Sequence, residues 1–174
     1  MLHATVLTFA IASALATGTN AAVPHLDLQR YIGTWHEIAH LPMFFQRQCV
    51  DRISATYTPL PDGTIEVRNA CRTNDGSIDE SIGVARPVDG HPGQLKVRFA
   101  PRWLAWLPMV WADYWVIDLD PDYRWAVVGG PSHKYLWVLS RTPTMERALF
   151  DRLKTRARER GYPVDKLVMA AALE

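Results

Sequence analysis

Apolar residues alternate most regularly in one long part of the chain, and an aromatic ring lies at its start and a cation at its end. Gly33 and Trp35 lie at the start of this part, and Arg141 lies at its end. A guanidinium that stacks on an indole contributes about 0.5–2 kcal/mol, and more where water is excluded. If the intervening strands form a sheet that closes on itself, the two side chains meet at the closure. We therefore predict a closed barrel whose floor contains Gly33, Trp35 and Arg141.

Between these residues, apolar side chains recur with a period of two, which is typical of strands with one buried face. Segments rich in Pro, Asp, Asn and Gly separate the strand candidates, for example Pro61 to Gly63. The candidates are 33–40, 50–58, 64–71, 78–86, 94–99, 113–119, 124–129 and 135–141. Short sequential connections favour an all-β fold, an eight-stranded antiparallel up-and-down β-barrel, over a sandwich. A barrel of about eight strands has an interior wide enough for one small ligand.

After residue 141 the apolar period becomes that of an amphipathic helix. An apolar stripe at helical spacing runs from Met145 to Ala157, with charged residues around it. We predict one C-terminal helix over about residues 144–160, ended by Gly161 and lying on the barrel. Residues 164–169 are a candidate for a ninth strand.

The composition indicates a soluble, exported, single-domain protein. The chain has 174 residues, 48% of them hydrophobic, and a formal net charge of +1, which gives no electrostatic argument for nucleic acid as a partner. Residues 1–21 contain no Lys, Arg, Asp or Glu, carry the apolar run Val6 to Ala16 and end in small residues. This pattern predicts a signal peptide over 1–21 and a mature domain over 22–174. No Cys lies near the predicted cleavage site, so we expect a periplasmic or cell-envelope protein that is not a lipoprotein.

The chain has two cysteines, Cys49 and Cys71. Strands 50–58 and 64–71 form a predicted hairpin that places both thiols at the same end of adjacent strands. In an exported chain this favours a disulfide, which stabilises by about 3–4 kcal/mol in the chain-entropy account. The alternative, a metal site or a reactive thiol, lacks further cysteines or a nearby pair of histidines. We predict no metal site, no cofactor and no catalytic residues.

Three segments of the sequence resemble the motifs of the lipocalin family, and more narrowly the bacterial lipocalins related to apolipoprotein D. They are Tyr31 to Ala39, Asp113 to Asp120, and Leu136 to Pro143. The sequence departs from the family pattern at two points. Ala112 occupies a position where the second motif often has Thr, and the lipobox Cys of many bacterial members is missing. The resemblance covers nearly the whole predicted mature chain, and it implies a barrel that holds a small hydrophobic ligand.

The resemblance also implies which side chains face the barrel lumen. With Trp35 inward, the alternation and the family alignment turn a mostly apolar and aromatic set inward. The predicted lumen residues are Glu37, Ala39, Ala55, Tyr57, Val67, Asn69, Val97, Phe99, Tyr114, Val116, Tyr135, Trp137 and Leu139. The competing interpretation is that these residues pack one another as a filled core.

Glu37 stands out in this set because an unpaired carboxylate in an apolar cavity needs a partner or a raised pKa. Asn69, Tyr114 or a ligand headgroup could supply a hydrogen bond. We hypothesise that Glu37 selects against free carboxylates or orients a polar headgroup. The alternative is a different strand register, in which Glu37 faces solvent.

A second unusual feature is the segment from Ala100 to Trp111, which joins two predicted strands at the open end of the barrel. We expect its large apolar residues to form a mouth or membrane contact, because exposed Trp next to Arg suits a lipid interface. They are Trp103, Leu104, Trp106, Leu107 and Trp111. The alternative is a lid that folds over the entrance and buries its own indoles.

Three function classes follow. The preferred one is a binding protein, not an enzyme, that holds a fatty acid, lysophospholipid or similar lipid in the lumen for transport, storage or maintenance in the cell envelope. It would be a monomer or homodimer with possible peripheral membrane contact and no nucleic-acid partner. The others are a lipocalin-fold enzyme acting on a lipid or isoprenoid, and a protein-interaction module that uses the tryptophan-rich loop.

Overall fold

The computed structural model describes residues 18–174. The apolar run of the predicted signal peptide lies outside the described residues. The described chain begins with an irregular segment that docks on the barrel, where the Val23 N–H donates to the carbonyl of Val116 at 2.8 Å. No helix within this part of the chain combines the length and the apolar character needed to cross a bilayer.

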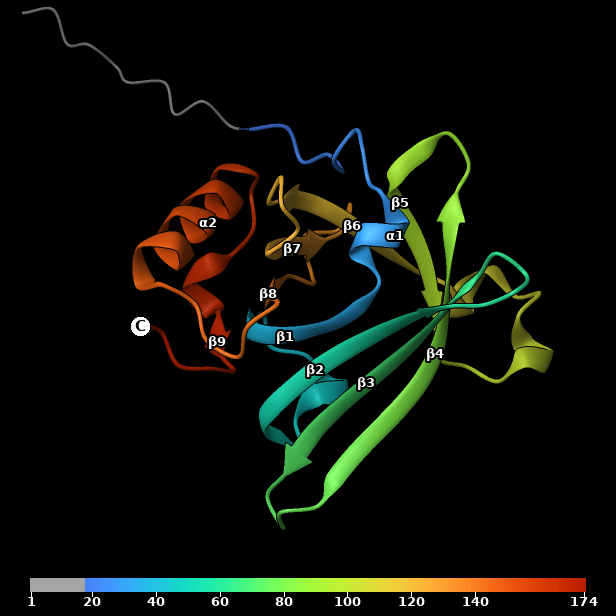
Figure 1. Ribbon diagram of the computed structural model, residues 1–174, viewed down its shortest axis with the longest axis horizontal. Helices are drawn as coiled ribbons and strands as arrows, with labels where there is room; N and C mark the ends of the chain where they lie inside the picture. The colour runs from blue at the N-terminus through green and yellow to red at the C-terminus, as the bar shows by residue number, and fades with distance from the viewer. Residues whose placement is uncertain (1–17) are drawn as a thin grey trace, which may run out of the picture.

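Nine strands within residues 18–174 form one antiparallel sheet, in the order β2-β3-β4-β5-β6-β7-β8-β1-β9. Because β1 also pairs with β2, the first eight strands close into the predicted up-and-down barrel (Figure 1). The strands are β1 Gly33–His40, β2 Cys49–Pro59, β3 Ile65–Thr73, β4 Ile78–Val88, β5 His91–Arg98, β6 Ala112–Leu119, β7 Trp125–Gly129, β8 Trp137–Ser140 and β9 Val168–Met169. The candidate ninth strand is thus reduced to two residues paired with β1.

The predicted C-terminal helix is present as α2, Arg147–Glu159, and it lies against one side of the barrel (Figure 1). It ends at Glu159, and Gly161, just after the C-cap Arg160, has a φ of 91°, the left-handed conformation that favours glycine. A one-turn helix, α1 Leu28–Tyr31, precedes β1 and is not predicted from the sequence pattern. Short 3₁₀ helices span Phe44–Gln46, Arg102–Leu104, Pro108–Val110 and Val164–Lys166.

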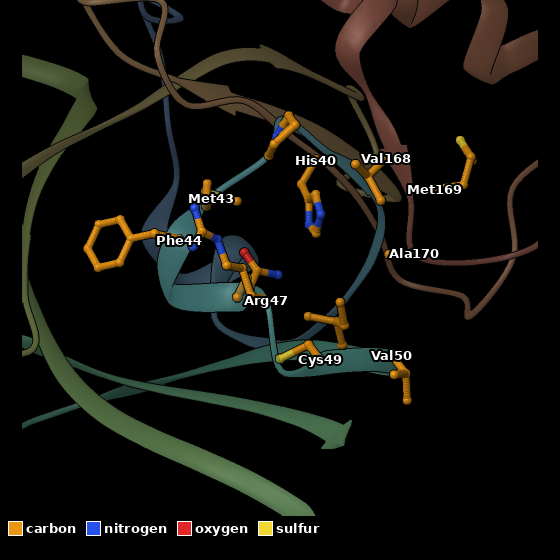
Figure 2. Close-up of a pocket in the computed structure, with 12 residues that line it drawn as sticks. His40, Met43, Phe44, Arg47, Cys49, Val50, Val168, Met169 and Ala170 are labelled. Atoms are coloured by element: carbon orange, nitrogen blue, oxygen red, sulfur yellow. The ribbon is translucent and has the colours of Figure 1, made fainter. Parts of the chain in front are cut away.

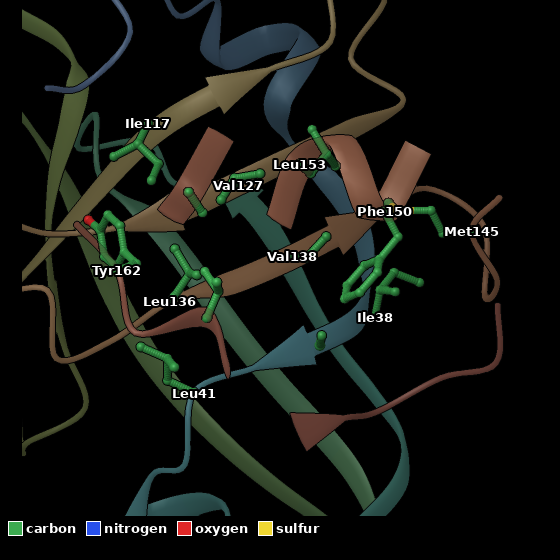
Figure 3. Close-up of a cluster of buried hydrophobic side chains, with 13 residues drawn as sticks. Ile38, Leu41, Ile117, Val127, Leu136, Val138, Met145, Phe150, Leu153 and Tyr162 are labelled. Carbon is green, nitrogen blue, oxygen red and sulfur yellow. The ribbon is translucent and has the colours of Figure 1, made fainter. Parts of the chain in front are cut away.

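Two separate cores hold these elements together. The outer core lies between α2 and the outer face of β1, β6, β7 and β8, and Figure 3 shows Phe150 and Leu153 of the helix facing Ile38, Val127 and Val138. The inner core fills the closed half of the barrel around a fully buried Trp35. The barrel is therefore covered by the helix outside and packed at one end inside.

The packed end contains the predicted stacking contact. The guanidinium carbon of Arg141 lies 3.8 Å from the centroid of the Trp35 ring. The same guanidinium donates to the carbonyls of Arg30, Ile32 and Thr34 at 2.8–3.0 Å. Gly33 has a φ of 95°, and a Cβ there would lie 3.3 Å from Nη1 of Arg141, so the position favours glycine.

The predicted disulfide is confirmed. Cys49 and Cys71 are bonded, with their Cα atoms 5.5 Å apart. The bond joins the start of β2 to the end of β3, at the barrel end opposite Trp35. Both cysteines also line the cavity described below.

Candidate ligand-binding cavity

The open half of the barrel encloses a cavity of about 570 Å³. Eleven of the thirteen predicted lumen residues line it. They are Glu37, Ala55, Tyr57, Val67, Asn69, Val97, Phe99, Tyr114, Tyr135, Trp137 and Leu139. The interior is therefore hollow here, and the interpretation of these side chains as a filled core is wrong for this half of the barrel.

Two predicted lumen residues lie elsewhere. Ala39 is in the outer core, because β1 has a bulge: Glu37 pairs with Leu139 and Ala39 with Val138, so two steps on β1 match one on β8. The alternation is shifted after Glu37, and Ala39 turns toward α2. Val116 does face inward, but it lies in the packed inner core, below the cavity.

The cavity is completed by residues that strand periodicity did not identify. The turn after β1 contributes Phe45, Gln46 and Gln48, and the loop between β5 and β6 contributes Ala100 and Val110. Others lie on strands, and they include Ile53, Ser81, Ala112, Asp113 and Val128. The alternation within β7 could have identified Val128, whereas no periodic signal marks the loop residues.

Glu37 is buried and lies at the centre of a polar network in the cavity wall. The side-chain amide of Gln46 donates to both carboxylate oxygens, at 3.0 and 2.8 Å, and His40 Nδ1 contacts Oε1. Trp137 Nε1 in turn donates to Gln46 Oε1 at 3.4 Å. The partners predicted for Glu37, Asn69 and Tyr114, are wrong, because the turn after β1 folds back and supplies Gln46.

A smaller cavity of about 280 Å³ lies on the other side of this network (Figure 2). His40 lines this side pocket, Glu37 lines the main cavity, and Gln46 borders both. In Figure 2 the ring of Phe44 points away from the side pocket. The Glu37–His40–Gln46 network therefore forms the partition between the two cavities.

Three tyrosines form the deep end of the main cavity. The hydroxyl of Tyr114 lies 2.7 Å from that of Tyr31 and 2.8 Å from that of Tyr57. Tyr57 and Tyr114 line the cavity, while Tyr31 packs beneath them against Trp35. Burial raises the pKa of Tyr57 to about 12 and raises those of Tyr31 and Tyr114 as well. All three phenols are therefore neutral at physiological pH.

The open end of the cavity carries exposed apolar side chains, which we call the mouth rim. They are Phe44, Phe45, Phe99, Trp103, Trp106 and Met109, with exposed fractions of 44–84%. The loop that carries the tryptophans projects beyond β4, on the side of the molecule away from α2 (Figure 1). Leu104 and Leu107, also predicted at the mouth, are half-buried.

Trp111 is not part of the exposed rim. The guanidinium carbon of Arg86 lies 4.1 Å from its ring centroid and that of Arg98 lies 5.2 Å away. Its indole N–H donates to the carbonyl of Ala105 at 2.8 Å. Trp111 therefore anchors the loop to the barrel, whereas Trp103 and Trp106 are exposed and remain available for the predicted mouth contact.

Comparison with known protein families gives a match over almost the whole described chain. A family model described as a lipocalin-like domain matches residues 26–172. Temperature-induced lipocalin-1 of Arabidopsis thaliana is 44% identical over 148 residues, which are 83% of this chain and 78% of that protein. The outer membrane lipoprotein Blc of Vibrio cholerae is 36% identical over 149 residues, covering 84% and 82% of the two chains. Apolipoprotein D of Mus musculus is 27% identical over 151 residues, covering 82% and 75%.

Solved structures share the same fold at lower sequence identity. Insecticyanin from the tobacco hornworm Manduca sexta superimposes with a TM-score of 0.67 at 20% identity, covering 90% of this chain and 86% of its own. The cockroach allergen Per a 4 gives a TM-score of 0.66 at 18% identity, covering 88% and 92%. These likenesses support the closed antiparallel barrel with its helix.

Proposed function

Because the chain belongs to the lipocalin family, we propose that it binds one lipid molecule, such as a fatty acid or lysophospholipid, in the barrel cavity. Family membership supports the binding of a small hydrophobic ligand. The lipid and its transport, storage or maintenance in the cell envelope are the proposed refinement.

The observation that carries this proposal is the 570 Å³ cavity itself. Its size lies in the range of small-molecule sites, and aromatic and aliphatic side chains form most of its wall. Burial of an acyl chain there contributes about 0.8 kcal/mol per methylene. Affinity should therefore rise in steps with chain length until the cavity is filled.

The charges around the cavity favour a ligand without a free carboxylate. Glu37, Asp79 and Asp113 line it, and its described lining contains no Lys or Arg. Lys96 pairs with Asp113 at 2.6 Å, but no described basic side chain pairs with Asp79. An added carboxylate would be repelled at this wall, so a zwitterionic lysophospholipid suits the cavity better than an ionised fatty acid.

The mouth rim supports an exchange of ligand with a lipid surface. Its tryptophans and phenylalanines are exposed beside the cavity opening, and Phe45 and Phe99 belong to both the rim and the lining. Large aromatic side chains of this kind settle at the boundary between lipid headgroups and acyl chains. A barrel docked in this way would present its opening to the membrane.

An envelope location agrees with this role. Relatives at 36% identity carry the name outer membrane lipoprotein. The disulfide between Cys49 and Cys71 suits an oxidising compartment outside the cytoplasm.

Blocking the cavity tests the proposal. Asn69 faces the cavity from β3, and its neighbour Arg68 is exposed and pairs with Glu80 on the outer surface. We expect Asn69→Trp to weaken the binding of lauroyl-lysophosphatidylcholine about tenfold or more, since excluding roughly two methylenes costs about 1.6 kcal/mol. The control Arg68→Trp should bind as wild type does. Calorimetric titration that finds equal affinities for both variants would place the lipid outside the barrel.

A further inference from the structure

The three tyrosines at the deep end of the cavity carry one more hydroxyl proton than the hydrogen bonds among them use. Tyr31, Tyr57 and Tyr114 carry one hydroxyl proton each, and two hydrogen bonds join their oxygens in a chain centred on Tyr114. Each bond uses one proton. Among residues 18–174 these hydroxyls have no other hydrogen-bonding partner, so one proton of the three has no acceptor.

This spare donor is deeply buried. The exposed fractions are 1% for Tyr31, 4% for Tyr57 and 8% for Tyr114. A buried donor without an acceptor destabilises the structure. Because Tyr57 and Tyr114 line the cavity and Tyr31 does not, an acceptor placed in the cavity can reach the spare proton when Tyr57 or Tyr114 carries it.

We infer that the deep end of the cavity is a subsite for a neutral oxygen acceptor, a carbonyl or hydroxyl oxygen, on the end of the ligand that enters the barrel first. The inference rests on the proposed function and names the ligand class more closely: an oxygenated hydrocarbon chain. A plain acyl terminus leaves the spare proton unsatisfied. A carboxylate does not suit the subsite, because the described cavity lining offers no Lys or Arg to balance its charge.

Two lysophospholipids that differ at one carbon test this. The first is lauroyl-lysophosphatidylcholine, and the second carries a ketone on the penultimate carbon of the same chain. The charged headgroup keeps both probes in one orientation, because its burial at the apolar end would be costly. An apolar pocket without a donor would bind the keto probe about tenfold more weakly than the parent.

We expect the keto probe to bind wild-type protein at least as tightly as the parent. The double variant Tyr57→Phe, Tyr114→Phe removes both hydroxyls that face the cavity, and it should lower keto-probe affinity about tenfold relative to the parent probe. Tyr31→Phe is the matched control. It removes one hydroxyl and one hydrogen bond of the chain, but it leaves two cavity-facing hydroxyls with one spare proton between them, so the keto preference should remain.

The outcomes separate the inference from the proposed function. Tight binding of the parent together with a tenfold weaker keto probe in wild-type protein overturns the inference alone, and this comparison holds even if the double variant does not fold. An unchanged ratio of the two affinities in a folded double variant overturns it as well. If wild-type protein binds neither probe, both the proposed function and the inference fail.

Discussion

Replacing Arg141 with Ala should destabilise the fold more than the loss of any exposed ion pair. The substitution removes a guanidinium stacked 3.8 Å from the Trp35 centroid and its three hydrogen bonds to the carbonyls of Arg30, Ile32 and Thr34. The stacking contributes about 0.5–2 kcal/mol. Hydrogen bonds to a charged donor each contribute at most about 1.5–3 kcal/mol when buried, and less here because Arg141 is partly exposed.

We therefore expect a loss of about 3 kcal/mol in the free energy of unfolding, equivalent to a fall of about 6–12 °C in Tm for a domain of this size. Arg141→Lys should recover less than half of the loss, because an ammonium neither stacks in a plane nor donates to several carbonyls in a fork. Urea unfolding of the disulfide-bonded protein, followed by tryptophan fluorescence, measures both.

The control is Arg68→Ala, which removes a surface pair with Glu80 and should change the free energy of unfolding by less than about 1 kcal/mol. If Arg141→Ala lies within about 0.5 kcal/mol of this control, the stacked floor does not hold the barrel closed, and the reasoning is refuted.

Three further predictions concern the cavity, its mouth and its deep end. Glu37→Gln should strengthen the binding of dodecanoate about fivefold or more relative to lauroyl-lysophosphatidylcholine, because it removes a repulsion of about 1 kcal/mol between the Glu37 carboxylate and the carboxylate of the ligand. Unchanged relative affinities would contradict the hypothesis that Glu37 selects against free carboxylates. The double variant Trp103→Ala, Trp106→Ala should lose co-sedimentation with phosphatidylcholine vesicles, whereas Ile82→Ala, which removes an apolar side chain 53% exposed on β4, should keep it. The pKa of Tyr57 is raised to about 12 in the folded state, so the folded state holds the phenol proton more tightly than the unfolded chain does. The contribution of this proton to the free energy of unfolding is complete below pH ~10 and is lost as the pH rises through 12. Alkaline titration of phenolate absorbance should show Tyr57 ionising above pH 10 in wild-type protein and that signal missing in Tyr57→Phe.

The barrel could be predicted from the sequence because its signals are local and repeated. Alternating apolar residues between turn residues define each strand, and the structure places β1 at the predicted residues 33–40. The stacking of Arg141 on Trp35 could be anticipated because both residues lie at fixed ends of the sheet. The Cys49–Cys71 bond followed from the hairpin geometry of β2 and β3.

The parts that could not be predicted depend on departures from regular alternation. The bulge in β1 is one extra residue, which shifts Ala39 to the outer core without leaving a mark in the apolar pattern. The partners of Glu37 come from His40 and from a 3₁₀ turn containing Gln46, and neither position follows from a period of two. Tyr31 joins the tyrosine chain from a one-turn helix outside every predicted strand.

The most direct test of the central claim is native mass spectrometry of the protein purified from the cells that make it, followed by extraction and identification of any bound lipid. We predict one lipid molecule per chain, and its loss in Asn69→Trp but not in Arg68→Trp. A protein that is empty as purified, and that takes up neither added fatty acid nor added lysophospholipid, would contradict the account.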